Sequence, residues 1–225
     1  MGSKVNILVE GQTEETFVNS VLAPYLFQYG IFPVPIIVKT NIEENGTTHK
    51  GGFVRYSEIR KQILRLLNDS SADIVTTMMD YYALPKSFPG KDDIQGHNCF
   101  EKVRYLERAW SEDIHHKKFF PYLQLHEFES ILFTSPLEIA TVFSEKQYIN
   151  RRLEDVRKKF SSPEEINDNP NTNPSSRIIK VAPEYQKVFH GPLIAGRIGL
   201  EKIKDECHHF SDWINTLKHF KDKKT

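Results

Sequence analysis

The sequence KVNILVEGQTEETFV (Lys4–Val18) contains a strand, a sharp break and the beginning of a helix. Its apolar run NILVE is typical of a buried strand, and Gly11 directly after it allows the backbone to turn sharply. The following segment, TEETFVNSVLAPYLFQYG, predicts a helix that Thr13 can cap, with acidic residues in the first turn where the helix dipole favours them. Pro24 is expected to bend this helix. The combination is typical of the first βα unit of an α/β protein.

Strand-like and helix-like segments continue to alternate through the first 135 residues. Further strands are predicted at 34–40, 72–80 and 119–129, and further helices at 56–69 and 99–114. The nearly continuous apolar run at 34–40 predicts a strand that is buried on both faces. Because strands alternate with helices, we predict an α/β fold with a parallel sheet flanked by helices.

The composition changes near Pro136, where strand-like segments end. Helices are predicted at 137–143, 146–160 and 200–220, and the polar segment 161–176 between them is rich in helix breakers. The sequence therefore predicts an α/β core at 1–135 and a helical C-terminal part at 136–225 that packs on it.

Composition narrows the classes of protein to which the chain can belong. The 225 residues are 39% hydrophobic with a negative mean hydropathy, and the longest apolar runs are too short to span a membrane. No signal-peptide pattern begins the sequence, so a cytoplasmic protein without membrane association is expected. Cys99 and Cys207 form no C-x-x-C pair, which argues against a disulfide framework or a cysteine zinc site. The net charge of zero counts against strong unaided binding to DNA, although a local patch or a partner subunit could supply positive charge.

Acidic residues stand where the predicted strands end. In a doubly wound parallel sheet the carboxyl ends of the strands form the usual site, so acids that are distant in sequence are expected to meet there. Because carboxylates at short range repel one another, a hard divalent cation is the natural compensator. We therefore predict a Mg²⁺ (or Mn²⁺) site from these residues: Glu10, Glu14, Asp80, Glu127 and Glu129.

Each of these acids also has a simpler interpretation when taken alone. Glu10 can be a surface acid, Glu14 a partner of the helix dipole, and Asp80 or Glu129 the cap of a turn or helix. His126 can be a core histidine with its hydrogen bonds satisfied. The common position of the acids at one edge of the sheet favours the metal site.

Three motifs resemble those of Toprim domains, especially the Toprim domains of OLD-type nucleases. ILVEGQTEETFV is similar to the first motif, in which a strand, E-G-x-T-E and a helix follow one another. IVTTMMDYYALP stands where the D-x-D motif occurs, and LQLHEFESILF stands where the OLD-like branch has a further acid. Together with GPLIAGRIGLEKIKDECHHFSDWI, nearly the whole chain resembles a bacterial Toprim-like family known as a domain of unknown function. Genes of that family often lie beside an ABC-type or OLD-like ATPase gene in a defence setting.

The resemblance implies a role for each matching acid. Glu10 matches the Toprim glutamate, a metal ligand or general acid/base, and Glu14 matches the second acid of E-G-x-T-E. Asp80 matches the first aspartate of D-x-D. Glu127 is the better match to the late acid, and Glu129 is the second.

The chain departs from the Toprim pattern at Tyr82, which replaces the second aspartate of D-x-D. A phenol is a poor ligand for Mg²⁺ at neutral pH. Either one metal position is weakened, or Glu127 and Glu129 substitute, with Asp92 and Asp93 as a weaker reserve. The replacement puts cleavage by two metal ions in doubt.

Basic groups should stabilise the charge on a transferring phosphate. Lys187 and Arg197 are the predicted catalytic cations, and their alternative interpretation is solvated surface charge. Other residues that could face the site are His190, Arg177, Asn167 and Asp168. The neighbouring His208 and His209 would point in different directions on a helix and make a poor zinc pair.

The resemblance and the acids together predict a Mg²⁺-dependent Toprim-type nuclease that hydrolyses DNA as the partner of an ABC/OLD-like ATPase subunit. RNA is the alternative substrate, including for a toxin. The rival hypothesis is a non-catalytic regulatory subunit of an ATPase complex. A homo-oligomer is left open.

Overall fold

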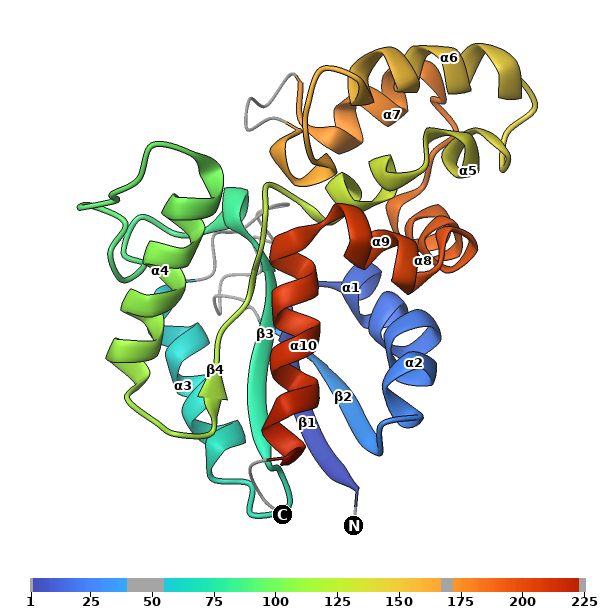
Figure 1. Ribbon diagram of the computed structural model, residues 1–225. Helices are drawn as coiled ribbons and strands as arrows, with labels where there is room; N and C mark the ends of the chain where they lie inside the picture. Colours follow the sequence, from blue (N-terminus) through green and yellow to red (C-terminus); the bar gives the residue numbers. More distant parts are fainter. Residues whose placement is uncertain (1, 40–54, 167–171, 223–225) are drawn as a thin grey trace, which may run out of the picture.

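The computed structural model describes residues 2–39, 55–166 and 172–222, and within them the strands form one parallel sheet (Figure 1). The strands are β1 (Ser3–Val9), β2 (Ile31–Ile37), β3 (Ile74–Asp80), β4 (Phe119–Phe120) and β5 (Leu123–Gln124). Their order is β2-β1-β3-β4, and β5 pairs with β3 beyond β4. The predicted α/β fold with a parallel sheet is confirmed.

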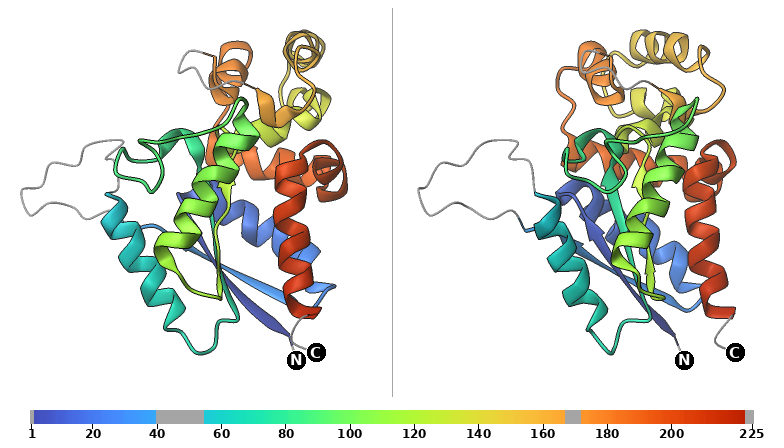
Figure 2. Two further views of the ribbon diagram at one scale, coloured as in Figure 1. Left: turned by 60° about the vertical axis from the view of Figure 1, so that its left-hand side comes forward. Right: turned by 90° about the vertical axis from the view of Figure 1, so that its left-hand side faces the viewer.

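Helices cover both faces of this sheet (Figure 2). The α-helices are α1 (Gln12–Phe17), α2 (Ala23–Phe27), α3 (Tyr56–Leu67), α4 (Cys99–Ile114), α5 (Pro136–Ala140), α6 (Lys146–Arg157), α7 (Pro174–Val181), α8 (Lys187–Ile198), α9 (Leu200–Glu206) and α10 (His208–Asp222). A π-helical turn, Val18–Leu22, joins α1 to α2, which has Pro24 in its first turn, and the bend expected at Pro24 stays a prediction. Short 3₁₀ segments lie at Tyr81–Ala83, Phe128–Thr134 and Pro163–Glu165.

Successive residues of the central strands belong alternately to two different hydrophobic clusters. Leu8 of β1 and Val75 of β3 pack with α3 and α4, whereas Ile7 and Ile74 pack with α1, α2, α10 and the C-terminal helices. This alternation follows from the two-residue period of a strand. Both faces of β1 and β3 are therefore buried, which positions their carboxyl ends rigidly.

The prediction that the second strand is buried on both faces is wrong. β2 is an edge strand, and the side chains of Phe32 and Val34 are 47% and 38% exposed. Pro33 and Pro35 lack the amide hydrogen that a central strand needs for pairing on both sides, so prolines in strands are largely confined to edges. Pro33 and Pro35 therefore already indicate in the sequence that this strand lies at an edge of the sheet.

The predicted strand at 119–129 is interrupted and much shorter than expected. β4 and β5 lie along the same side of β3, with Pro121 and Tyr122 between them. There the hydroxyl of Thr77 accepts from the amide of Tyr122 (2.9 Å) and donates to its carbonyl oxygen (2.8 Å). A side chain thus replaces the missing main-chain ladder, and the chain beyond β5 enters the 3₁₀ segment Phe128–Thr134.

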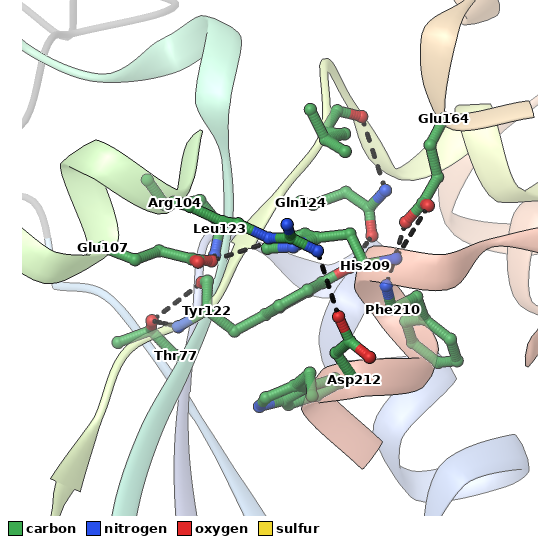
Figure 3. A network of polar contacts seen from close by, with 12 residues as sticks. Thr77, Arg104, Glu107, Tyr122, Leu123, Gln124, Glu164, His209, Phe210 and Asp212 are labelled. Carbon is green, nitrogen blue, oxygen red and sulfur yellow. Dashed lines mark hydrogen bonds and ion pairs between the residues drawn. The ribbon is translucent and has the colours of Figure 1, made fainter. Parts of the chain in front are cut away.

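The helix predicted at 200–220 is broken at Cys207 into α9 and α10. Figure 3 shows the reason: the buried carboxylate of Glu164 accepts hydrogen bonds from the amides of His209 and Phe210, both at 2.9 Å, and so caps α10. His209 also pairs with Glu107 (2.9 Å), and Trp213 donates to Thr76 (2.9 Å). These contacts hold α10 against the sheet.

The helices that follow residue 136 therefore occupy two different places relative to the sheet. In Figure 1, α10 lies along the sheet, whereas α5, α6 and α7 lie beyond the carboxyl ends of the strands. The division at residue 136 stays a prediction. None of the helices in the described ranges combines the length and apolarity needed to cross a membrane.

Candidate active site

The carboxyl ends of β1 and β3 bring two of the predicted acids together. Glu10 follows β1, Asp80 ends β3, and the two strands are paired with Val9 opposite Met78. The amide of Asp80 donates a hydrogen bond to Oε2 of Glu10 (3.2 Å). Adjacent parallel strands end at the same edge, and this contact is the direct consequence.

Glu14 lies in the first turn of α1 and points back toward the same edge. Its side chain is 7% exposed, and its Oε2 accepts from the amide of Gly11 (2.9 Å). The turn after β1 does not use the conformational freedom of glycine, contrary to expectation. Gly11 has an extended φ of −157°, and a Cβ there would meet only Glu14 Oε2, at 3.6 Å.

Glu127 and Glu129 flank the start of the 3₁₀ segment that follows β5. They are 7% and 1% exposed, and Lys187 at the amino end of α8 contacts both, with Nζ at 3.2 Å from Glu127 Oε2 and 3.4 Å from Glu129 Oε2. Glu127 also accepts from the amide and the hydroxyl of Ser175 at the start of α7, and Tyr185 donates to Glu129 (3.3 Å). Residues of the helical C-terminal part therefore cover these two acids.

Burial and mutual repulsion perturb the acids. Burial is the main cause that raises the pKa of Asp80 well above its usual value, and the charges of Glu10 and Glu14 raise it further. Burial also raises the pKa values of Glu10 and Glu129, and it raises that of Glu14 to about 7. For Lys187 burial acts in the opposite direction, but Glu129 and Glu127 outweigh it and raise its pKa. One ammonium group thus compensates only part of the negative charge.

The donor set fits a divalent cation in chemistry. Oδ1 of Asp80 is buried and has no hydrogen-bond partner among the described residues, so a buried oxygen lacks a donor or a cation. In the same ranges, no three His, Cys, Asp or Glu side chains stand in a metal-ligand arrangement, and Glu127 and Glu129 contact Lys187. Carboxylate oxygens are the ligands that Mg²⁺ prefers.

Arg197 does not join this site, contrary to expectation. It stands ten residues after Lys187 on α8, which corresponds to roughly 15 Å along the helix axis, and its Nε pairs with Glu138 (3.2 Å). His190 Nδ1 accepts a hydrogen bond from the amide of Gln186 (2.8 Å), directly before α8, so its ring binds the amino end of that helix.

The remaining candidates are placed as follows. Arg177 donates to the carbonyl oxygen of Thr172, and Asp92 and Asp93 are exposed. Asn167 and Asp168 lie outside the described ranges.

Tyr82, at the position of the second D-x-D aspartate, presents a side chain that is 49% exposed. Its amide donates to the carbonyl oxygen of His126 (3.2 Å), and His126 is buried with a left-handed φ of 61°. Tyr185 was not among the site residues predicted from the sequence. Ser175 was not among the predicted site residues either, and its hydroxyl donates to Glu127 (3.0 Å).

Among solved structures, the chain is similar to the C-terminal region of the Burkholderia pseudomallei OLD protein, with 14% identity and a TM-score of 0.44, covering 97% of this chain and 100% of that one. It is also similar to the C-terminal region of the Xanthomonas campestris pv. campestris OLD protein, with 16% identity and a TM-score of 0.35, covering 96% and 98%. Similarity at this level assigns no function. No curated protein is significantly similar to the chain.

The family comparison is more extensive. The profile of a domain of unknown function, DUF4276, matches residues 9–218, which include β3, all the clustered acids and most of α10. A match over nearly the whole chain shows common descent, and the chain belongs to the DUF4276 family.

Proposed function

We propose that the chain is a Mg²⁺-dependent, Toprim-type phosphodiesterase that hydrolyses DNA together with an ATPase subunit. The observation that carries the proposal is the contact of Glu10 with Asp80 at the carboxyl edge of the sheet, beside a buried Asp80 oxygen for which the described part of the chain provides no hydrogen-bond partner. A structural role alone would not explain why buried acids are concentrated around one lysine, because like charges at short range cost free energy.

Glu10, Glu14 and Asp80 would hold the cation, because their carboxylates share the edge where β1, α1 and β3 meet. Glu127 and Glu129 would complete the ligand set once Lys187 releases them. Mg²⁺, when bound, supplies a water of lowered pKa and neutralises phosphate oxygens. Lys187 would then be free to stabilise the negative charge of the phosphate.

An ATPase partner would supply most of the binding affinity for DNA. The chain has 30 basic and 30 acidic residues, so it lacks the positive bias of proteins that hold nucleic acid alone. RNA is the alternative substrate of the same site, since phosphodiester chemistry does not distinguish the two.

Nicking of supercoiled plasmid tests the proposal, with Mg²⁺ or Mn²⁺ against EDTA and with or without a neighbouring ATPase. Asp80→Asn and Glu10→Gln should abolish metal-dependent nicking. The control Asp212→Asn removes an exposed acid that pairs with Arg104 (3.2 Å) and should leave nicking unchanged. Equal activity of Asp80→Asn and wild type would overturn the assignment, and a parallel assay on RNA decides the substrate.

A non-catalytic subunit is the second candidate, and two observations favour it. Tyr82 replaces an acid of the Toprim pattern, and Lys187 already neutralises part of the site. This alternative predicts that the chain assembles with an ATPase but shows neither nicking nor Mg²⁺ binding by calorimetry.

A further inference from the structure

A second cluster of charged and aromatic groups lies far from the acids, between α2, α9 and α10. The phenol oxygen of Tyr25 accepts hydrogen bonds from the ammonium groups of Lys204 (2.8 Å) and Lys218 (2.7 Å) and donates to Glu201 (2.8 Å). Lys218 also lies 3.9 Å from the ring centroid of Tyr29. Two cations are thus held close to one oxygen.

The carboxylate in this cluster does not balance both lysines. Glu201 binds Lys204 directly (2.8 Å) and accepts from Tyr25. Lys218 has no carboxylate within ion-pair distance among the described residues, and its Nζ contacts the faces of Tyr25 and Tyr29 instead. A cation on an aromatic face keeps its full charge and can still attract an anion.

Two further exposed aromatic rings flank Tyr29 in the sequence. Phe27, at the end of α2, and Phe32, on the edge strand β2, are 50% and 47% exposed, with ring centroids 5.4 Å apart. Tyr29 between them in sequence is 37% exposed. Exposed rings grouped in this way call for a partner with flat apolar groups.

We propose that this aromatic–lysine surface, formed by Phe27, Tyr29, Phe32 and Lys218, binds single-stranded nucleic acid. The rings offer faces on which bases stack, and Lys218 offers charge to a backbone phosphate, whereas Lys204 is 12% exposed and pairs with Glu201. This combination of stacking faces and cations is what binding to single strands requires, without reading base edges. The chain's zero net charge is compatible with a local site of this kind.

The surface is separate from the acid cluster. Phe32 is paired with Lys4 near the amino end of β1, whereas Glu10 follows its carboxyl end. The seven residues of β1 span about 20 Å. A strand bound here would therefore contact the protein without needing the acids or a metal.

Fluorescence anisotropy with a labelled oligothymidine of roughly 20 nucleotides, in EDTA and at low salt, tests the proposal. Phe32→Ala, Phe27→Ala and Lys218→Gln should each weaken binding about tenfold, and Lys218→Gln should also reduce the salt slope by about 0.7. The control Lys202→Gln removes an exposed lysine of α9 that stands two residues from Lys204 and faces another direction. It should bind as wild type does.

Several outcomes would overturn the proposal. These are no binding by wild type, wild-type affinity in all three variants of folded protein, or equal affinity for an abasic strand, which would show that bases do not stack. Loss of an ATPase complex in Phe32→Ala without any oligonucleotide binding would assign the surface to a protein. Asp80→Asn should still bind the oligonucleotide in EDTA, so failure of the nuclease proposal and failure of this one are distinguishable.

Discussion

The amide of Asp80 donates to the carboxylate of Glu10 across 3.2 Å, although the two residues are 70 positions apart in the chain. The bond orders Glu10 but leaves the buried Oδ1 of Asp80 without a donor among the described residues. The two acids therefore meet in an arrangement that is ordered by the backbone and unfavourable in charge. Such an arrangement should respond to pH, to divalent cations and to neutralising substitutions.

Stability should fall as the pH rises through the neutral range. Glu14 titrates near 4.5 in the unfolded chain, whereas burial raises its pKa to about 7 in the folded one. Between these values the folded state binds more protons, so the free energy of unfolding decreases with pH, by on the order of 3 kcal/mol for this group. Urea unfolding in EDTA at pH 5 and pH 8 measures the difference. Glu14→Gln should flatten the dependence, and an unchanged slope in that variant would contradict the explanation.

Neutralising Asp80 should separate stability from metal binding. Asp80→Asn replaces a carboxyl group whose charged form Glu10 and Glu14 repel, so at pH 8 in EDTA we expect a gain of about 1 kcal/mol. Mg²⁺ should raise the Tm of wild type through preferential binding to the folded state, but not that of the variant. Thermal unfolding with and without Mg²⁺ gives both readouts. Asp212→Asn is the control, and a Mg²⁺ response retained by Asp80→Asn would exclude Asp80 as a ligand.

Lys187 should contribute more to stability than a lysine or arginine of equal exposure. Lys187→Met leaves Glu129, whose side chain is 2% exposed, without its ammonium partner, and should cost about 2 kcal/mol. Arg197 is equally exposed, at 45%, but its partner Glu138 is 29% exposed, so Arg197→Gln should cost less than about 1 kcal/mol. Chemical denaturation at pH 8 compares them. Equal losses would show that burial of the partner acid does not matter.

Gly191 should be required for the close approach of α8 to the site. A Cβ at this position would lie 3.0 Å from Phe128 and 3.3 Å from the hydroxyl of Tyr185. Gly191→Ala should therefore destabilise the protein by about 1–3 kcal/mol. At Gly196 on the same helix a Cβ meets only Val21, at 3.6 Å, so Gly196→Ala should be neutral or stabilising by up to about 1 kcal/mol. The reverse order of the two free energies of unfolding would refute this packing.

Much of the fold follows from local patterns. The apolar runs in 6–10 and 72–80 predict β1 and β3, and the helical periodicity of 56–69 and 99–114 predicts α3 and α4. The acids could be grouped before the structure because the carboxyl ends of parallel strands share one edge. The contact of Glu10 with Asp80 is a consequence of that rule.

Other features depend on strand order. The apolar composition of 34–40 suggested a buried strand, but β2 is at the edge of the sheet. Composition reports that a residue avoids water, whereas strand order decides which neighbours cover it. Pro33 and Pro35 carried the missing information, because they restrict pairing to one side.

The sequence alone therefore determined the parallel α/β architecture and the edge at which the acids gather, since both arise from short-range periodicity. Only the tertiary structure decided that Lys187 and not Arg197 reaches the acids, and that Lys218 meets Tyr25 across 193 positions of chain. The physical reason is that such pairs depend on the rotation and close approach of helices packed from distant segments. No local pattern encodes these quantities.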